Sequence, residues 1–319
     1  MEDLNRFIAL LSALFPDENQ VPKQLYQARA FRRVLQGEPV EVVAGETGLT
    51  KSYLRTWSSA ISDGNFYRWT RRKPPTDERL ARSRAGIAQM MLGFLAEAHF
   101  EGSAQHLLHS GGFSISDDRA ASTDTDYRLL DAENRTVCRL NIKFHGTLFR
   151  AAKEYVGLEP EDCFALATYK ISTALQRQQI EAVPYVFLVV TVPSLPRSYI
   201  EGHITEDAVW LASVSSRAIE ETIARQLLTE PWAEGLKAQI ERAQFRVISA
   251  SRAHRLLHEK LFERVFALRV KAFNWTFRGA EIDMHLSLNS EMILFSEFVD
   301  NITQRGVREV AIRLDRGEI

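Results

Sequence analysis

Apolar positions recur every three to four residues in the first part of the chain, which places them on one face of a helix. Residues 4–14 show this spacing, and a second helix follows Pro22 and ends at Gly37. The segment 71–76 contains two adjacent prolines, which interrupt helices and the hydrogen bonding of sheets, so we expect a linker there. The pattern therefore predicts an all-α N-terminal domain over residues 1–75.

Beyond residue 84 the pattern becomes mixed. A helical face from Ile87 to Ala98 precedes an extended stretch at 113–116 and expected strands at 127–130 and 136–144. A helix over 162–181 and a buried strand over 185–192 follow. This order predicts an α/β domain over residues 76–193. An α+β extension over residues 194–319 is expected from helices at 216–228, 232–242 and 251–262 and alternating segments at 281–288 and 310–314.

Composition restricts the possible functions. The net charge is −1, so any nucleic-acid surface must come from local segregation of charge. Two cysteines exclude a disulfide framework and a cysteine-rich zinc site. The chain has no apolar run of roughly 20 residues and no basic, cleavable leader at its start, so we expect a cytoplasmic protein without membrane partners. We expect no organic cofactor.

Residues 40–59 carry the pattern of two helices joined by a tight turn. Gly48 suits a left-handed turn, Ala44 allows close helix crossing, and Thr50 is suited to cap the second helix. The segment resembles bacterial helix-turn-helix domains, which bind double-stranded DNA. The resemblance implies that the DNA-facing residues are Thr50, Lys51, Ser52, Arg55 and Thr56.

A basic segment follows the second of these helices. Residues 67–84 hold seven basic and two acidic side chains, with Tyr67 and Trp69 interleaved. A local charge of +5 suits phosphate contact, and we expect it from Arg68, Arg71, Arg72 and Lys73. A helical hairpin that only packs, followed by a solvated linker, is the structural alternative.

Acidic and basic residues mark the two expected strands at 127–130 and 136–144. Asp126 stands before the first strand, and Asn141 and Lys143 on the second share one face because side chains alternate along a strand. Ile142 then points into the core, with its carbonyl free to join a metal shell. These residues, and the order helix, three strands, helix, strand, resemble the PD-(D/E)xK nuclease superfamily over residues 84–192.

That resemblance implies a metal-dependent DNA endonuclease of restriction or anti-phage defence type. Its Mg²⁺ or Mn²⁺ would be held by Asp126, Asn141 and Glu101, with Asp124 as a further ligand and Glu97 as the fallback for Glu101. Lys143 would support the attacking water and the developing charge. Cutting both strands would favour a homodimer, and further partners in a defence complex are expected.

Asn141 stands where the superfamily has an acid, and three interpretations stay open: a native amide ligand, a degenerate DNA-binding relative, or an engineered change. The rival function is a non-catalytic DNA-binding regulator or defence-complex subunit. The helix over 162–181 offers a further polar site residue, and the candidates are Lys170, Gln176 and Gln179. His145 follows Lys143 on the same strand face and is a candidate for a residue that lies near the metal without binding it directly. His254 and His258 share a helix face, but nearby basic residues favour a solvated or phosphate-contacting surface.

Overall fold

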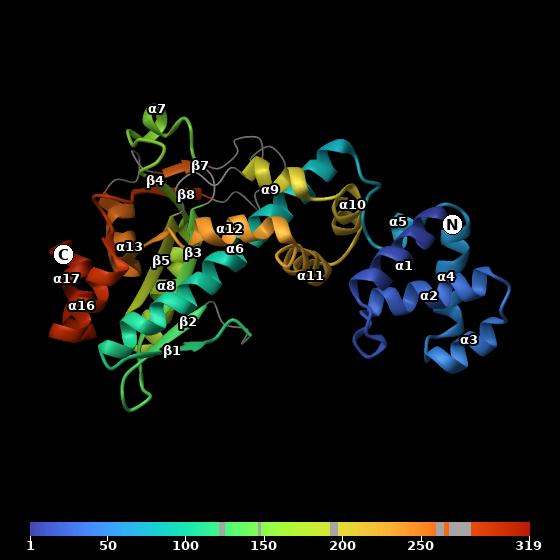
Figure 1. Cartoon of the computed structure of the whole chain (residues 1–319), viewed down its shortest axis with the longest axis horizontal. Helices are drawn as coiled ribbons and strands as arrows, with labels where there is room; N and C mark the ends of the chain where they lie inside the picture. The colour runs from blue at the N-terminus through green and yellow to red at the C-terminus, as the bar shows by residue number, and fades with distance from the viewer. Residues whose placement is uncertain (121–124, 146–147, 192–196, 260–264, 268–281) are drawn as a thin grey trace. The chain divides into compact units, whose positions relative to one another are not determined.

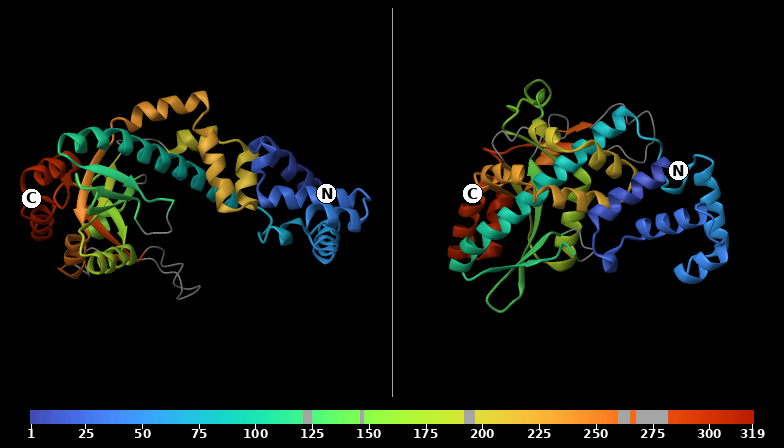
Figure 2. Two further views of the ribbon diagram at one scale, coloured as in Figure 1. Left: turned by 90° about the horizontal axis from the view of Figure 1, so that it is seen from below. Right: turned by 45° about the vertical axis from the view of Figure 1, so that its right-hand side comes forward.

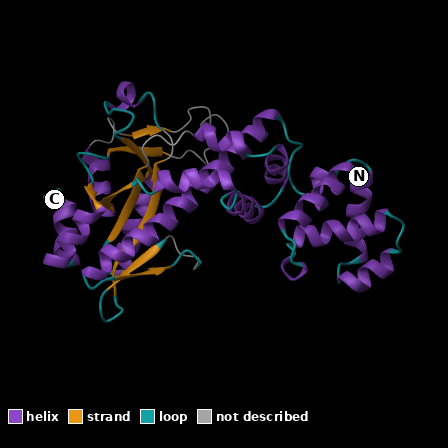
Figure 3. Cartoon of the chain, viewed as in Figure 1, coloured by secondary structure: helices purple, strands orange, loops and turns teal. Residues whose placement is uncertain are grey.

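The computed structural model describes residues 1–120, 125–145, 148–191, 197–259, 265–267 and 282–319 (Figure 1). The fold is mixed α/β, as predicted, with a six-stranded sheet, a three-stranded sheet and many helices. The chain divides into two compact units. Unit 1 comprises Met1–Phe94 and Pro196–Leu236, and unit 2 comprises Leu95–Leu195 and Lys237–Ile319. The described strands all belong to unit 2 (Figure 3).

Helices and the loops between them make up the described part of unit 1. The α-helical elements begin with a short bundle in which α1, α2 and α4 contact one another in turn. They are α1 (Glu2–Leu14), α2 (Lys23–Leu35), α3 (Val40–Thr47), α4 (Lys51–Ser62), α5 (Phe66–Trp69), the first part of α6 (Asp77–Ser110), α9 (Arg197–His203), α10 (Glu206–Val214) and α11 (Arg217–Leu227), with 3-10 turns at η1 (Glu18–Gln20) and η2 (Pro231–Ala233).

The compact units differ from the expected domain ranges. The segment 71–76 is non-helical, as expected of a linker, but α6 starts directly after it and crosses from unit 1 into unit 2. Part of the expected C-terminal extension also belongs to unit 1. The reason is apolar packing, because Trp210 of α10 stacks on Phe66 with ring centroids 6.3 Å apart and lies 4.5 Å beneath the guanidinium of Arg6.

Unit 2 is built on a sheet with the order β1-β2-β3-β5-β6-β9. Strands β3 and β5 are parallel, and the other neighbours are antiparallel. A second, antiparallel sheet has the order β4-β8-β7. The strands are β1 (Ser114–Asp117), β2 (Tyr127–Leu130), β3 (Thr136–His145), β4 (Cys163–Ala167), β5 (Tyr185–Thr191), β6 (Gln244–Ser249), β7 (Val265–Ala267), β8 (Ile282–Ser287) and β9 (Ile293–Leu294).

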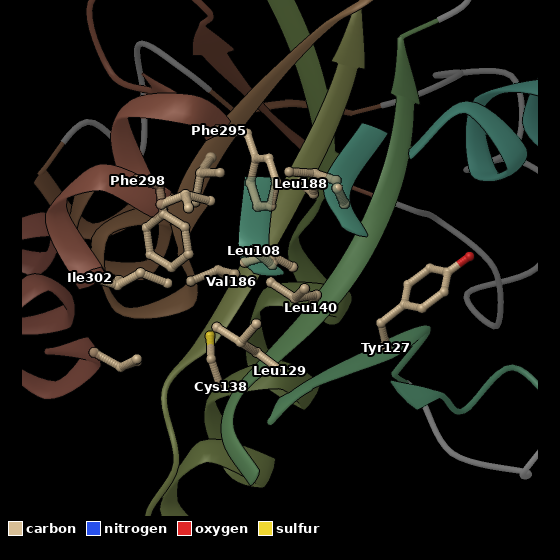
Figure 4. Packing of buried hydrophobic residues seen from close by; sticks show 14 of the residues in the cluster. Leu108, Tyr127, Leu129, Cys138, Leu140, Val186, Leu188, Phe295, Phe298 and Ile302 are labelled. Carbon is tan, nitrogen blue, oxygen red and sulfur yellow. The ribbon is translucent and has the colours of Figure 1, made fainter. Parts of the chain in front are cut away.

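Two hydrophobic cores lie on opposite faces of the six-stranded sheet, because side chains alternate along its central strand. Val186 and Leu188 of β5 join the first core with residues of α6 and the C-terminal helices (Figure 4). Phe187 and Val189 join the second core. Figure 2 shows α6 over one face of the sheet and α8 over the other. The remaining helices of unit 2 are α7 (Ala152–Val156), α8 (Thr168–Glu181), α13 (Ala250–Glu259), α16 (Phe295–Arg305) and α17 (Val307–Arg316). Helix α12 (Glu234–Ile240) begins in unit 1 and ends in unit 2.

The expected order of helix, three strands, helix and strand is present from α6 to β5, with α7 and β4 added before α8. Two expectations were wrong. The first residues of the expected helix 162–181 form β4, which pairs with β8, and the alternating segment 310–314 lies in helix α17. Strand β6 was not predicted. Among the described residues, no helix combines the length and the apolar character needed to cross a membrane.

Candidate functional site

Asp126 and Lys143 meet at the edge of β3 where the partner strand β2 begins. The pairing of β2 with β3 starts at Tyr127 opposite Leu140, and β3 continues beyond this pair to His145. The carboxylate of Asp126 accepts a hydrogen bond from the backbone N–H of Ile142 at 2.6 Å. The Nζ of Lys143 donates to the carbonyl of the same residue at 2.9 Å. Two site side chains therefore bind both polar groups of one strand residue.

Asn141 and Lys143 share a strand face, as predicted. Asn141 is buried and pairs across the sheet with Phe187, while Lys143 pairs with Val189, and both partners belong to the second core. Ile142 packs against the first core, also as predicted. Its carbonyl was expected to be free to join a metal shell, and in the structure that oxygen accepts a hydrogen bond from the ammonium of Lys143.

Burial and neighbouring charges shift the pKa values at this edge. Burial raises the pKa of Asp126, although the cations of Lys143 and Lys170 oppose the shift. Burial lowers the pKa of Lys143 to about 8, and the nearby charge of Lys170 lowers it further, whereas Asp126 and Glu97 act in the opposite direction. The site is therefore a partly desolvated cluster in which protons are held less firmly by its lysine and more firmly by its aspartate.

Arg119 organises the acidic residues next to this edge and was missed by the sequence interpretation. Its guanidinium contacts Glu97 at 2.6 Å and Asp117 at 2.7 Å, and it also pairs with Glu101. The carboxylate of Glu101 further accepts the hydroxyl of Tyr127 at 2.6 Å. No local motif identifies an arginine between β1 and β2, and the convergence arises only when α6 covers that hairpin.

The two acids of α6 have different surroundings. The carboxylate of Glu101 pairs with Arg119 and accepts the hydroxyl of Tyr127. Glu97, expected only as the fallback, is the acid whose charge acts on Lys143. Of these two acids of α6, Glu97 rather than Glu101 therefore acts electrostatically on Lys143.

Helix α8 contributes one of its three candidates. The charge of Lys170 acts on both Asp126 and Lys143, whereas Gln176 and Gln179 are exposed to solvent. The N-terminal turn of α8 therefore supplies a second cation, Lys170, to the sheet edge.

His145 lies at the end of β3. Its ring packs edge-on against Phe164 of the second core, with centroids 5.9 Å apart.

The predicted metal ligands do not form one ready ligand set. Asp126 binds the backbone N–H of Ile142, Asn141 is buried opposite Phe187 of the second core, Glu101 is paired with Arg119, and Asp124 lies outside the described residues. Within those residues, no group of three or more His, Cys, Asp or Glu side chains is placed to share a metal ion. Oxygen donors suited to Mg²⁺ are present, but protein cations already neutralise them.

The turn between α3 and α4 matches its prediction in detail. Gly48 has a φ of +66°, and the hydroxyl of Thr50 accepts the backbone N–H of Tyr53 at 3.2 Å as an N-cap. Four further side chains of α4 are exposed, as expected, and these are Lys51, Ser52, Arg55 and Thr56. Glu41 of α3 pairs with Arg55 at 2.9 Å.

The following basic segment is only partly available to a ligand. Arg68, Arg71 and Lys73 are exposed. Arg72 is exposed as well, but it donates to the backbone carbonyl of Ser215 at 2.7 Å, which ties the segment to the other stretch of unit 1. We therefore separate Arg72, which holds the fold of unit 1, from the other three cations.

Comparison with known proteins gives no match to a protein-family model, to a curated protein or to a solved structure.

Proposed function

We propose that this protein is a DNA-binding phosphodiesterase, with duplex contacts in unit 1 and a hydrolytic site at the β3 edge of unit 2. The observation that carries the proposal is the convergence of Asp126 and Lys143 on Ile142, with Lys170 close enough to influence both charges. A carboxylate beside two lysines suits the binding of a phosphodiester and the stabilisation of the charge that develops during its hydrolysis. The resemblance to PD-(D/E)xK nucleases supports the same reading.

Each residue of the site has a distinct role in this proposal. Lys143 and Lys170 bind the non-bridging oxygens of the scissile phosphate, and Asp126 faces the reacting region as the charged oxygen donor. Mg²⁺ or Mn²⁺ would supply Lewis-acid stabilisation and a water of lowered pKa. Asp126 and Asn141 would hold that ion, and Glu101 would complete the set after releasing Arg119.

Contacts of unit 1 with DNA would come from the exposed face of α4 and the basic segment after α5. The exposed Lys51 and Arg55, together with Arg68, Arg71 and Lys73, provide cations for phosphate oxygens. Ser52 and Thr56 lie among them and offer hydroxyl groups to base edges. Three further proposals rest on analogy with the superfamily alone. They are a role in restriction or anti-phage defence in the cytoplasm, formation of a homodimer, and binding to partners in a defence complex.

A second function, non-catalytic DNA binding on a nuclease-like core, is favoured by two observations. Asn141 brings no charge to the site, and Arg119 already neutralises the acids of α6. A protein of this kind would use Lys143 and Lys170 to bind phosphate without hydrolysis.

Plasmid relaxation and linearisation, with Mg²⁺ or Mn²⁺ and with EDTA, separate the two functions. We expect metal-dependent cleavage by the unmodified chain, and a loss of roughly 100-fold or more in Asp126→Ala and in Lys143→Ala. Lys153→Ala is the matched control, because Lys153 is an exposed lysine paired with Glu159. Asn141→Asp should raise turnover by adding a negative charge. If neither the unmodified chain nor Asn141→Asp cleaves DNA or RNA, the non-catalytic function replaces the proposed one.

A further inference from the structure

Two histidines on α13 form a close pair away from the β3 edge. His254 is half-buried and His258 is exposed, and their separation of four residues places them on one face of the helix. Their Nε2 atoms lie 3.0 Å apart, and the ring centroids are separated by 4.3 Å at an angle of 74°. The two imidazoles therefore direct the same nitrogen atom toward one point.

The distance between the two Nε2 atoms is that of a hydrogen bond between the rings, and it also matches one ligand geometry. Imidazole nitrogens bind divalent transition metals at about 2.0–2.1 Å. Two such ligands at a right angle lie about 2.9 Å apart, whereas two ligands of a tetrahedral site lie about 3.3 Å apart. The 3.0 Å separation of His254 and His258 is close to the first value. It corresponds to neighbouring positions of a square-planar or octahedral ion.

The surroundings keep the pair suited to a cation. Burial lowers the pKa of His254, and the charge of the neighbouring His258 lowers it further. Arg255, between the two histidines in sequence, lies 3.7 Å from the carboxylate of Glu259, which offsets part of its charge. A hydrogen bond between the rings needs one Nε2 to carry a proton, and a change of tautomer makes both nitrogens acceptors.

We propose that His254 and His258 form a two-imidazole site for a divalent transition metal, with affinity in the order Cu²⁺, Ni²⁺, Zn²⁺. This order follows from the preference of imidazole for borderline cations and from the right-angled geometry. The remaining coordination positions are filled by water or by an oxygen ligand such as phosphate. Mg²⁺ is excluded, because it prefers oxygen ligands. The site is independent of the hydrolytic function proposed above.

The test is titration of the full-length, tag-free chain with Cu²⁺ and Ni²⁺, followed by calorimetry and by electron paramagnetic resonance of the Cu²⁺ form. We expect one site whose spectrum shows coupling to imidazole nitrogens, and about 10-fold or greater loss of affinity in His254→Ala/His258→Ala. His106→Ala/His109→Ala is the matched control, because it removes two exposed histidines three residues apart on α6. Mg²⁺ at millimolar concentration should not displace the bound ion.

A single change guards against loss of folding. His258→Gln alters only the exposed member of the pair and should lower the affinity for Cu²⁺ by a similar factor, with an unchanged circular dichroism spectrum. Absence of a site in the unmodified chain would overturn the proposal. So would equal affinity in the unmodified chain and the α13 double variant, or equal losses in the α13 and α6 variants.

Discussion

The α3–α4 turn and the β3 edge are assembled in opposite ways. The turn lies within about 20 consecutive residues, and Gly48 and Thr50 determine its geometry through backbone conformation and one capping hydrogen bond. The β3 edge collects side chains from α6, the β1–β2 connection, β3 and α8, from Glu97 to Lys170. A site of the first kind follows from local sequence, whereas a site of the second kind depends on strand register and on helices packed over it.

The two regions also differ in how their charges meet water. The side chain of Lys51 on α4 is 56% exposed, whereas burial lowers the pKa of Lys143 to about 8. Exposed cations attract phosphates through a field that salt screens. A desolvated lysine near neutral pH instead responds to protons. We therefore expect salt concentration to govern DNA binding by unit 1 and pH to govern the charge of Lys143 at the β3 edge.

The largest expected effect tests the salt side of this comparison. Lys51→Glu/Arg55→Glu should weaken binding to duplex DNA by about 100-fold at low salt, because two cations are replaced by two anions. The dependence of affinity on salt should become shallower. Fluorescence anisotropy with a labelled duplex over a range of salt concentrations measures both quantities.

The control for that variant carries the same change in charge elsewhere. Arg135→Glu/Lys153→Glu alters two exposed cations of unit 2 that are paired with acids, as Arg55 is paired with Glu41. Its affinity should stay within a few-fold of the unmodified chain. Equal losses in both variants would mean that net charge, rather than the face of α4, governs binding.

The sequence predicted the parts of the fold that depend on local signals. The linker after α5, the cap at Thr50 and the buried strand β5 all follow from residue type and spacing. Strand β4 was mistaken for helix because its apolar residues find their partner in β8, more than 100 residues later. The apolar positions around Val310 fit the repeat of a strand as well as that of a helix, and the burial of Val307, Val310 and Leu314 on one face favours the helix.

The candidate site was predictable only in part for the same reason. Strand alternation correctly placed Asn141 and Lys143 on one face, since that property is local. Two features depend on where β2 begins and on the packing of α6 over the hairpin. One is the binding of the N–H and the C=O of Ile142 by Asp126 and Lys143, and the other is the set of contacts made by Arg119. These facts are set by tertiary packing and leave no sequence motif.

The pH side of the comparison can be tested without assuming any activity. The folded-state pKa of Lys143 is about 8, below the 10.5 of the free side chain, so its charge destabilises the fold below pH 8 and this cost disappears as the pH rises toward 10.5. Lys143→Met should therefore raise the free energy of unfolding at pH 7 by about 1–3 kcal/mol. The gain should shrink steadily between pH 8 and pH 10.

Lys51→Met is the matched control for this measurement, because the Lys51 side chain is exposed. Its free energy of unfolding should change by less than about 0.5 kcal/mol, with no trend over the same pH range. Urea unfolding at several pH values provides both curves. A destabilised Lys143→Met at pH 7 would show instead that the hydrogen bond to Ile142 outweighs the cost of burying the charge.

The smallest expected effect concerns the local side of the comparison and uses two glycines three residues apart. Gly48 ends α3 with a φ of +66°, whereas Gly45 lies within that helix, and an added methyl group meets no atom within 4 Å at either position. The backbone alone therefore decides the outcome. Gly48→Ala should lower the free energy of unfolding by about 1 kcal/mol, because alanine resists the left-handed conformation. Gly45→Ala should raise it by about 0.5–1 kcal/mol through helix propensity. Changes of the same sign in urea unfolding would mean that the conformation of the turn is set by packing rather than by its own sequence.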